Sequence, residues 1–70
     1  MKELETFAER VRAARKNKKW TYEKLGENAG ITDAAVCRIE KRQNTPTLYT
    51  AIALAKALNV SLEWLCGLDE

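Results

Sequence analysis

Residues 21–40 read TYEKLGENAGITDAAVCRIE, and two short helices separated by a tight joint account for this stretch. Thr21 is a good N-cap for a helix that ends near Ala29. Gly30 is placed to end that helix, and Thr32 is placed to cap the next helix only two residues later. So short a joint predicts a sharp crossing between the two helices, because it cannot reverse the chain comfortably into an antiparallel pair.

The second of these two helices has an inward and an outward face. Val36 and Ile39 recur at helical spacing and are expected to point into the core. The outward face carries Asp33, Ala34, Cys37, Arg38 and Lys41. In the helix before it, Gly26 costs roughly 1 kcal/mol relative to Ala, which predicts that a neighbouring helix packs closely there.

The flanking sequence predicts three further helices and no strand. An amphipathic helix is expected over residues 3–17. Thr47 is the expected cap of a fourth helix that stops near Asn59, and Ser61 the cap of a short fifth helix. The inward positions of the fourth helix are predicted to be Leu48, Ala51, Ile52, Ala55 and Leu58. The chain is therefore expected to form one compact all-α domain over residues 1–70.

Composition excludes several classes of function. The chain has no histidine, and its two cysteines, Cys37 and Cys66, do not form a CxxC pair. Histidine is the commonest general base and metal ligand, so we expect no metal, no cofactor, no small-molecule substrate and no enzymatic activity. No apolar run approaches the roughly 20 residues of a membrane span, and the N-terminus lacks the apolar core of a signal peptide. These features predict a cytoplasmic protein with free thiols and no membrane contact.

The charge is unevenly distributed along the chain. Residues 1–42 contain eleven Lys and Arg and seven acidic residues, for a net charge of +4, whereas residues 43–70 have a net charge of −2. A basic half next to an acidic half suits a molecule that presents one side to a polyanion.

A helix, a short turn containing Gly and a second helix form the helix-turn-helix plan. Residues 21–40 resemble this unit in the phage repressor and Cro-like (XRE-type) regulators. The resemblance continues through NTPTLYTAIALAKALNVSLEWLCG and covers roughly residues 8–68. It is carried by Gly26, Gly30, Val36, Ile39 and Glu40, which match the family pattern.

The resemblance implies a five-helix, lambda-repressor-like domain whose helix-turn-helix unit spans about residues 21–41. It further implies a bacterial or phage-encoded, nucleoid-associated regulator of transcription that binds double-stranded DNA. We expect a repressor that binds its operator as a homodimer, with the third helix in the major groove. A protein-interaction or antitoxin-like module on the same fold is the alternative, because Asp33 is unusual at a base-reading position.

The family position of the third helix implies that Asp33, Ala34 and Arg38 read bases. Asp can accept a hydrogen bond from a cytosine amino group, Ala can contact a thymine methyl, and Arg can bind guanine. Two alternatives stay open: Asp33 is a first-turn acid favoured by the helix dipole, and Arg38 is a phosphate contact.

Two segments match the places where the family holds phosphates. They are the start of the second helix and the loop after the third, which contain Thr21, Tyr22, Lys41, Arg42, Gln43 and Asn44. Tyr22 stands where the family often has Gln. Lys19 and Arg42 replace glycines common in the family, so we expect the local turns to differ. A solvated loop is the alternative for residues 41–44.

The resemblance also implies a structural ion pair and a dimer surface. Arg15 and Glu40 match a family pair that would lock the third helix to the first, and an ordinary surface pair is the alternative. The fifth helix commonly supplies the dimer contact, which here means Leu62, Trp64, Leu65, Cys66 and Leu68. Alternatively, Trp64 fills the core of the monomer.

Overall fold

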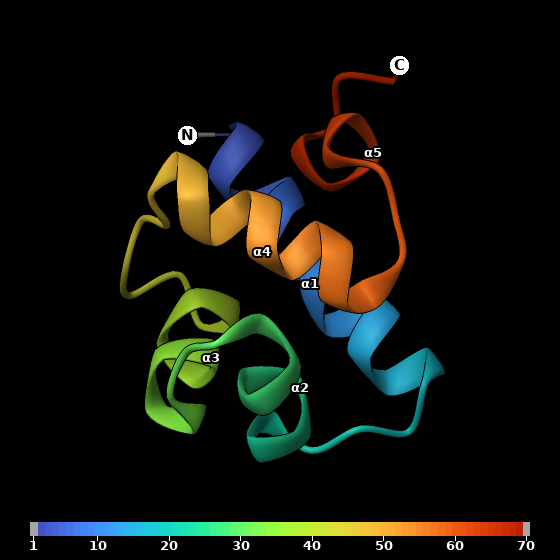
Figure 1. Ribbon diagram of the computed structural model, residues 1–70. Coiled ribbons are helices and arrows are strands. Elements are labelled where there is room, and N and C mark those ends of the chain that lie inside the picture. Colours follow the sequence, from blue (N-terminus) through green and yellow to red (C-terminus); the bar gives the residue numbers. More distant parts are fainter. Residues whose placement is uncertain (1, 70) are drawn as a thin grey trace.

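A computed structural model describes residues 2–69, which contain five α-helices. They are α1 (Lys2–Asn17), α2 (Tyr22–Ala29), α3 (Asp33–Glu40), α4 (Leu48–Leu58) and α5 (Leu62–Cys66). No strand occurs within residues 2–69. Figure 1 shows α2 and α3 together at one end of the molecule, α5 toward the opposite end, and α1 and α4 crossing between them.

Side-chain hydroxyl groups begin four of the helices, as the sequence predicts. Each of these hydroxyl oxygens accepts a hydrogen bond from the backbone N–H three residues further on; the caps are Thr21, Thr32, Thr47 and Ser61. Helices α2 and α4 end at residues in the left-handed conformation, Gly30 (φ 75°) and Asn59 (φ 58°). Local polar chemistry therefore fixes where most of the helices begin and end.

The core lies where α1 and α4 meet the other three helices. Its fully buried large side chains are Val11, Leu25, Val36, Leu54, Leu58 and Leu65. The sequence-based prediction for Leu48 is wrong, since this side chain is 63% exposed. It is the first residue of α4, and the buried stripe of this helix runs through Ala51, Leu54, Ala55 and Leu58. Leu48 and Ile52 lie on one edge of this stripe, so Ile52 is only half-buried, and Leu54 lies in the core.

Gly26 makes the sharp α2–α3 joint possible. A Cβ atom at this position would lie 2.6 Å from the carbonyl oxygen of Ile31, which is closer than any real contact. Its next neighbours are the Thr32 carbonyl carbon at 3.2 Å and the Asp33 nitrogen at 3.3 Å, so the close packing that the sequence predicts occurs against the joint and the start of α3. The Ile31 N–H donates to the Gly26 carbonyl over 2.9 Å and closes the joint onto α2.

The described part of the chain contains neither a membrane-spanning helix nor a candidate metal site. Within residues 2–69 no helix is both long enough and apolar enough to cross a bilayer. The same residues contain no group of three or more His, Cys, Asp or Glu side chains placed to hold a metal ion.

Candidate nucleic-acid interface

The three predicted base-reading residues are exposed on α3. Val36 and Ile39 are buried on the opposite side of the same helix, as the sequence predicts, and of the predicted outward residues only Cys37 is half-buried and not exposed. Ala34 and Arg38 are four residues apart and therefore share one side of the helix. α3 thus presents the Asp33 carboxylate next to the Ala34 methyl group, and the Arg38 guanidinium lies one turn further along the helix.

Asp33 has a local partner. One of its carboxylate oxygens accepts a hydrogen bond from the Ala34 N–H over 2.9 Å. This contact places a negative charge at the N-terminus of α3, where the helix dipole favours it. The geometry matches the alternative in which Asp33 stabilises the first turn, and base reading by Asp33 stays a prediction.

The loop after α3 exposes four consecutive donors, Lys41, Arg42, Gln43 and Asn44. The loop folds back onto the helix, because the N–H of Gln43 donates to the Arg38 carbonyl over 2.8 Å. Its two positive charges therefore follow directly on the exposed face of α3. This is the basic segment of the interface, defined here as residues 41–44.

Lys19 and Arg42 adopt left-handed backbone conformations, with φ values of 60° and 62°. A non-glycine residue pays about 1–2 kcal/mol for this conformation. Each of the two turns therefore carries a positive charge on a residue in the left-handed region, and a difference from the turns of the family stays a prediction.

Arg15 and Glu40 form a buried, two-pronged ion pair. Arg15 Nε donates to Glu40 Oε2 over 2.7 Å, and Arg15 Nη2 donates to Glu40 Oε1 over 3.1 Å. The Arg15 side chain is 9% exposed and that of Glu40 is 1% exposed. The structure therefore has the buried pair and not its surface alternative, and this pair ties the last residue of α3 to α1.

Two further contacts complete the surroundings of Arg15. Its Nη1 donates to the Trp20 carbonyl over 2.7 Å, and the Tyr22 ring lies 4.5 Å from its guanidinium carbon. The hydrogen bonds to Glu40 raise the pKa of Arg15 above its ordinary value, against the opposing effect of burial. Because the folded-state pKa is raised, this contribution to stability is complete below the ordinary pKa of arginine and is lost only at higher pH.

The predicted dimer residues of α5 and the turn after it divide into three groups by their exposure to solvent. Leu68 is exposed, and Leu62, Trp64 and Cys66 are half-buried. The prediction for Leu65 is wrong, because this side chain has no exposed surface and belongs to the core. Its position in α5 directs it toward α1 and α4, so it is not available to a second copy of the chain.

Arg10 holds Trp64 in place, and the sequence-based reasoning missed this contact. Its guanidinium carbon lies 5.0 Å from the centre of the Trp64 ring, and its Nη1 donates to the Trp64 carbonyl. The same nitrogen is 2.9 Å from Asp69 Oδ1. These partners are 54 or more residues away in sequence, so no local pattern announces them.

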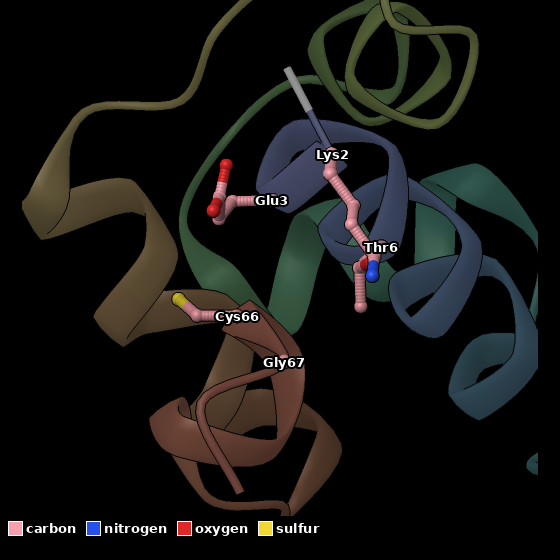
Figure 2. Close-up of a pocket in the computed structure, with 5 residues that line it drawn as sticks. All are labelled: Lys2, Glu3, Thr6, Cys66 and Gly67. Carbon is pink, nitrogen blue, oxygen red and sulfur yellow. The ribbon is translucent and has the colours of Figure 1, made fainter. Parts of the chain in front are cut away.

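A hollow of about 240 Å³ lies between α1 and the end of α5, lined by Lys2, Glu3, Thr6, Cys66 and Gly67. Figure 2 shows these residues, which come from the first turns of α1 and from α5 and its cap. None of the residues predicted to contact DNA lines it. The hollow and the exposed face of α3 are thus separate features of the molecule.

Comparison with known proteins points to one family. The Helix-turn-helix family profile matches residues 11–65. Control protein C.SmaI of Serratia marcescens is 38% identical over 58 residues, which are 83% of this chain and 69% of that protein.

Two solved structures are similar over most of the chain. The crystal structure of the P22 c2 repressor in complex with synthetic operator 9T has a TM-score of 0.80 and 34% identity, covering 84% of this chain and 89% of that one. The restriction-modification controller protein C.AhdI from Aeromonas hydrophila has a TM-score of 0.85 and 28% identity, covering 93% and 98% of the two chains. This chain belongs to the helix-turn-helix family of phage repressors and control proteins.

Proposed function

We propose that this protein is a sequence-specific DNA-binding regulator of transcription that represses by occupying an operator. The arrangement of α3 carries the proposal. This helix exposes Asp33, Ala34 and Arg38, is anchored by the buried Arg15–Glu40 pair, and continues directly into the basic segment at residues 41–44. Family membership and the similarity to a repressor seen with its operator support the same function.

In this proposal the two contact types have separate tasks. Asp33, Ala34 and Arg38 face the base edges of the major groove, where donor and acceptor patterns differ between base pairs. Lys41, Arg42, Gln43 and Asn44 hold the phosphates on one side of the groove. Thr21 and Tyr22 lie at the N-terminus of α2, and helix N-termini attract phosphate. Phosphate contacts give affinity and register, and base contacts give sequence preference.

We further propose that the chain acts as a homodimer and without catalysis. Leu68 and the half-buried side chains of Leu62, Trp64 and Cys66 would supply the contact between copies. Helix-turn-helix dimers bind half-sites about 34 Å apart, so the operator is expected to have two-fold symmetry. The place of action is the cytoplasm, where bacterial DNA is accessible.

The test is the salt dependence of binding to a selected DNA fragment. For the wild-type chain a plot of the logarithm of the association constant against the logarithm of the salt concentration should be a steeply falling line. Its slope should be about −0.9 for each phosphate contacted. Arg42→Gln should lower this slope by about 0.9 if the residue holds one phosphate. Lys56→Gln is the matched control, because Lys56 is exposed on α4 and its substitution removes the same charge outside the proposed interface.

Equal slopes for wild type and Arg42→Gln would contradict the proposed role of the basic segment. A slope change as large for Lys56→Gln would show that only total charge matters.

Arg38→Ala separates base reading from phosphate binding. If Arg38 reads guanine, the variant should lose preference at one base pair, whereas a uniform loss of affinity across sequences would show that Arg38 binds phosphate.

A further inference from the structure

The guanidinium of Arg15 is held in its own plane by three hydrogen bonds. Nε and Nη2 donate to the Glu40 carboxylate, and Nη1 donates to the Trp20 carbonyl. These bonds use three of the five N–H donors of arginine, all of which lie in one plane, and leave its two faces open to an aromatic partner. The Tyr22 ring lies over one face, 4.5 Å from the central carbon.

Tyr22 connects this pair to the helix-turn-helix unit itself. It is the first residue of α2, is half-buried and packs against the hydrophobic core. Arg15 comes from α1, and Glu40 is the last residue of α3. One ring thus covers the point where three helices meet, and it shields the charged pair from water. A cation is attracted to an aromatic face, and the attraction strengthens where water is excluded.

We propose that Tyr22 is a positioning residue for DNA recognition. Its ring holds the Arg15 guanidinium in the orientation that binds Glu40, and so fixes the angle at which α3 meets DNA. The proposal rests on the proposed function and adds to it, since the ring would act through Arg15 while the hydroxyl is proposed to bind phosphate. A side chain without an aromatic face cannot supply the contact with Arg15.

Two variants separate the ring from the hydroxyl. Tyr22→Phe keeps the ring and removes the hydroxyl, and Tyr22→Leu keeps a bulky apolar side chain and removes the ring. The quantity to measure is the ratio of affinities for a selected operator and for an unrelated duplex at one salt concentration. Tyr22→Phe should keep this ratio within about twofold, because loss of a phosphate contact weakens both duplexes equally. Tyr22→Leu should lower it about tenfold, the size of one mismatched base pair.

Either of two results would overturn the proposal. If folded Tyr22→Leu keeps the wild-type ratio, the ring only stabilises the fold. If Tyr22→Phe loses as much of the ratio as Tyr22→Leu, the hydroxyl and not the ring is responsible.

A second measurement needs no DNA. In a double-mutant cycle on urea unfolding, Tyr22→Leu and Glu40→Gln should be coupled by about two- to fivefold in the unfolding constant. Tyr22 and Glu40 both contact Arg15, so the coupling reports that the ring helps to hold the ion pair. Arg15→Lys replaces Glu40→Gln in a second cycle, so that the test survives if Glu40→Gln does not fold. Tyr49→Leu is the matched control, because Tyr49 is exposed and should show no coupling.

The two measurements distinguish the two proposals. Absence of coupling in both cycles overturns the role of the ring. A wild-type chain that binds no duplex, with the coupling intact, overturns the proposed function.

Discussion

Helix α1 carries two arginines with the same kinds of partner in different surroundings. Arg15 pairs with Glu40 and lies against Tyr22, and Arg10 pairs with Asp69 and lies against Trp64. The side chains of the first pair are 9% and 1% exposed, whereas those of the second are 22% and 41% exposed. What differs is access to water.

This difference assigns the two clusters different tasks. Losing one partner of a buried pair leaves an uncompensated charge, which is strongly destabilising, whereas an exposed pair is screened and contributes little. The Arg15 cluster therefore anchors α3, the proposed DNA-reading helix. The Arg10 cluster fastens α5 and the following turn to α1, beside the proposed dimer surface.

The largest expected effect is that of Glu40→Gln. It leaves the Arg15 charge buried, so the free energy of unfolding should fall by about 3–5 kcal/mol in urea denaturation. A domain of 70 residues has a stability of only about 4–10 kcal/mol, so partial unfolding without denaturant also fits. The double variant Arg15→Met with Glu40→Leu removes both charges and should be more stable than Glu40→Gln. A loss below about 1 kcal/mol would make this pair equivalent to a surface pair.

Arg10→Met should have an intermediate effect. It removes the contact with the Trp64 ring, the hydrogen bond to the Trp64 carbonyl and the pair with Asp69, while a long apolar side chain remains. We expect a loss of about 1–2 kcal/mol by the same denaturation measurement. Trp64 fluorescence should shift in the folded state, because the ring loses its cover. A loss as large as that of Glu40→Gln would erase the contrast between the two clusters.

Asp69→Asn should have a smaller effect still. The carboxylate is partly exposed and is one of several partners of Arg10, so the loss should stay below about 1 kcal/mol. Thermal denaturation of the two proteins side by side measures it. A loss of 2 kcal/mol or more, on the order of a buried charged hydrogen bond, would show that the site is drier than its exposure implies.

High salt should change the stability loss of the exposed pair and leave that of the buried pair nearly unchanged. At about 1 M salt the screening length is about 3 Å, so the small difference between wild type and Asp69→Asn should vanish. The difference between wild type and Glu40→Gln should persist, because buried pairs are screened much less. Unfolding curves at low and high salt for both variants provide the comparison, and equal salt sensitivity would contradict it.

Local sequence predicts the helix ends of this protein well. Thr21, Thr32, Thr47 and Ser61 each cap a helix, since the chemistry of a cap is contained in four residues. The placement of Leu48 is wrong because the apolar face of α4 is wider than the stripe that the rest of the fold covers, and helical spacing does not show which part is covered. Leu65 was wrong for a related reason, since a short apolar helix does not reveal which of its side chains the rest of the fold covers.

The site shows the same division between local and long-range information. The exposed face of α3 follows from helical spacing, and the Arg15–Glu40 pair from the family resemblance. The position of the Tyr22 ring over Arg15 could not be foreseen, because it depends on how α2 starts relative to α1. The left-handed backbone of Lys19 and Arg42 could not be foreseen either, because non-glycine residues adopt it only where the surrounding structure requires it.

The most direct test of the DNA-binding role is selection from a pool of genomic fragments at low salt with the wild-type chain. The account predicts one enriched sequence with two related half-sites centred about 34 Å apart, and predicts that a chain with Arg38→Ala and Arg42→Gln no longer enriches it. Recovery of no enriched sequence by folded wild-type protein, or equal enrichment by the doubly substituted chain, would contradict the account.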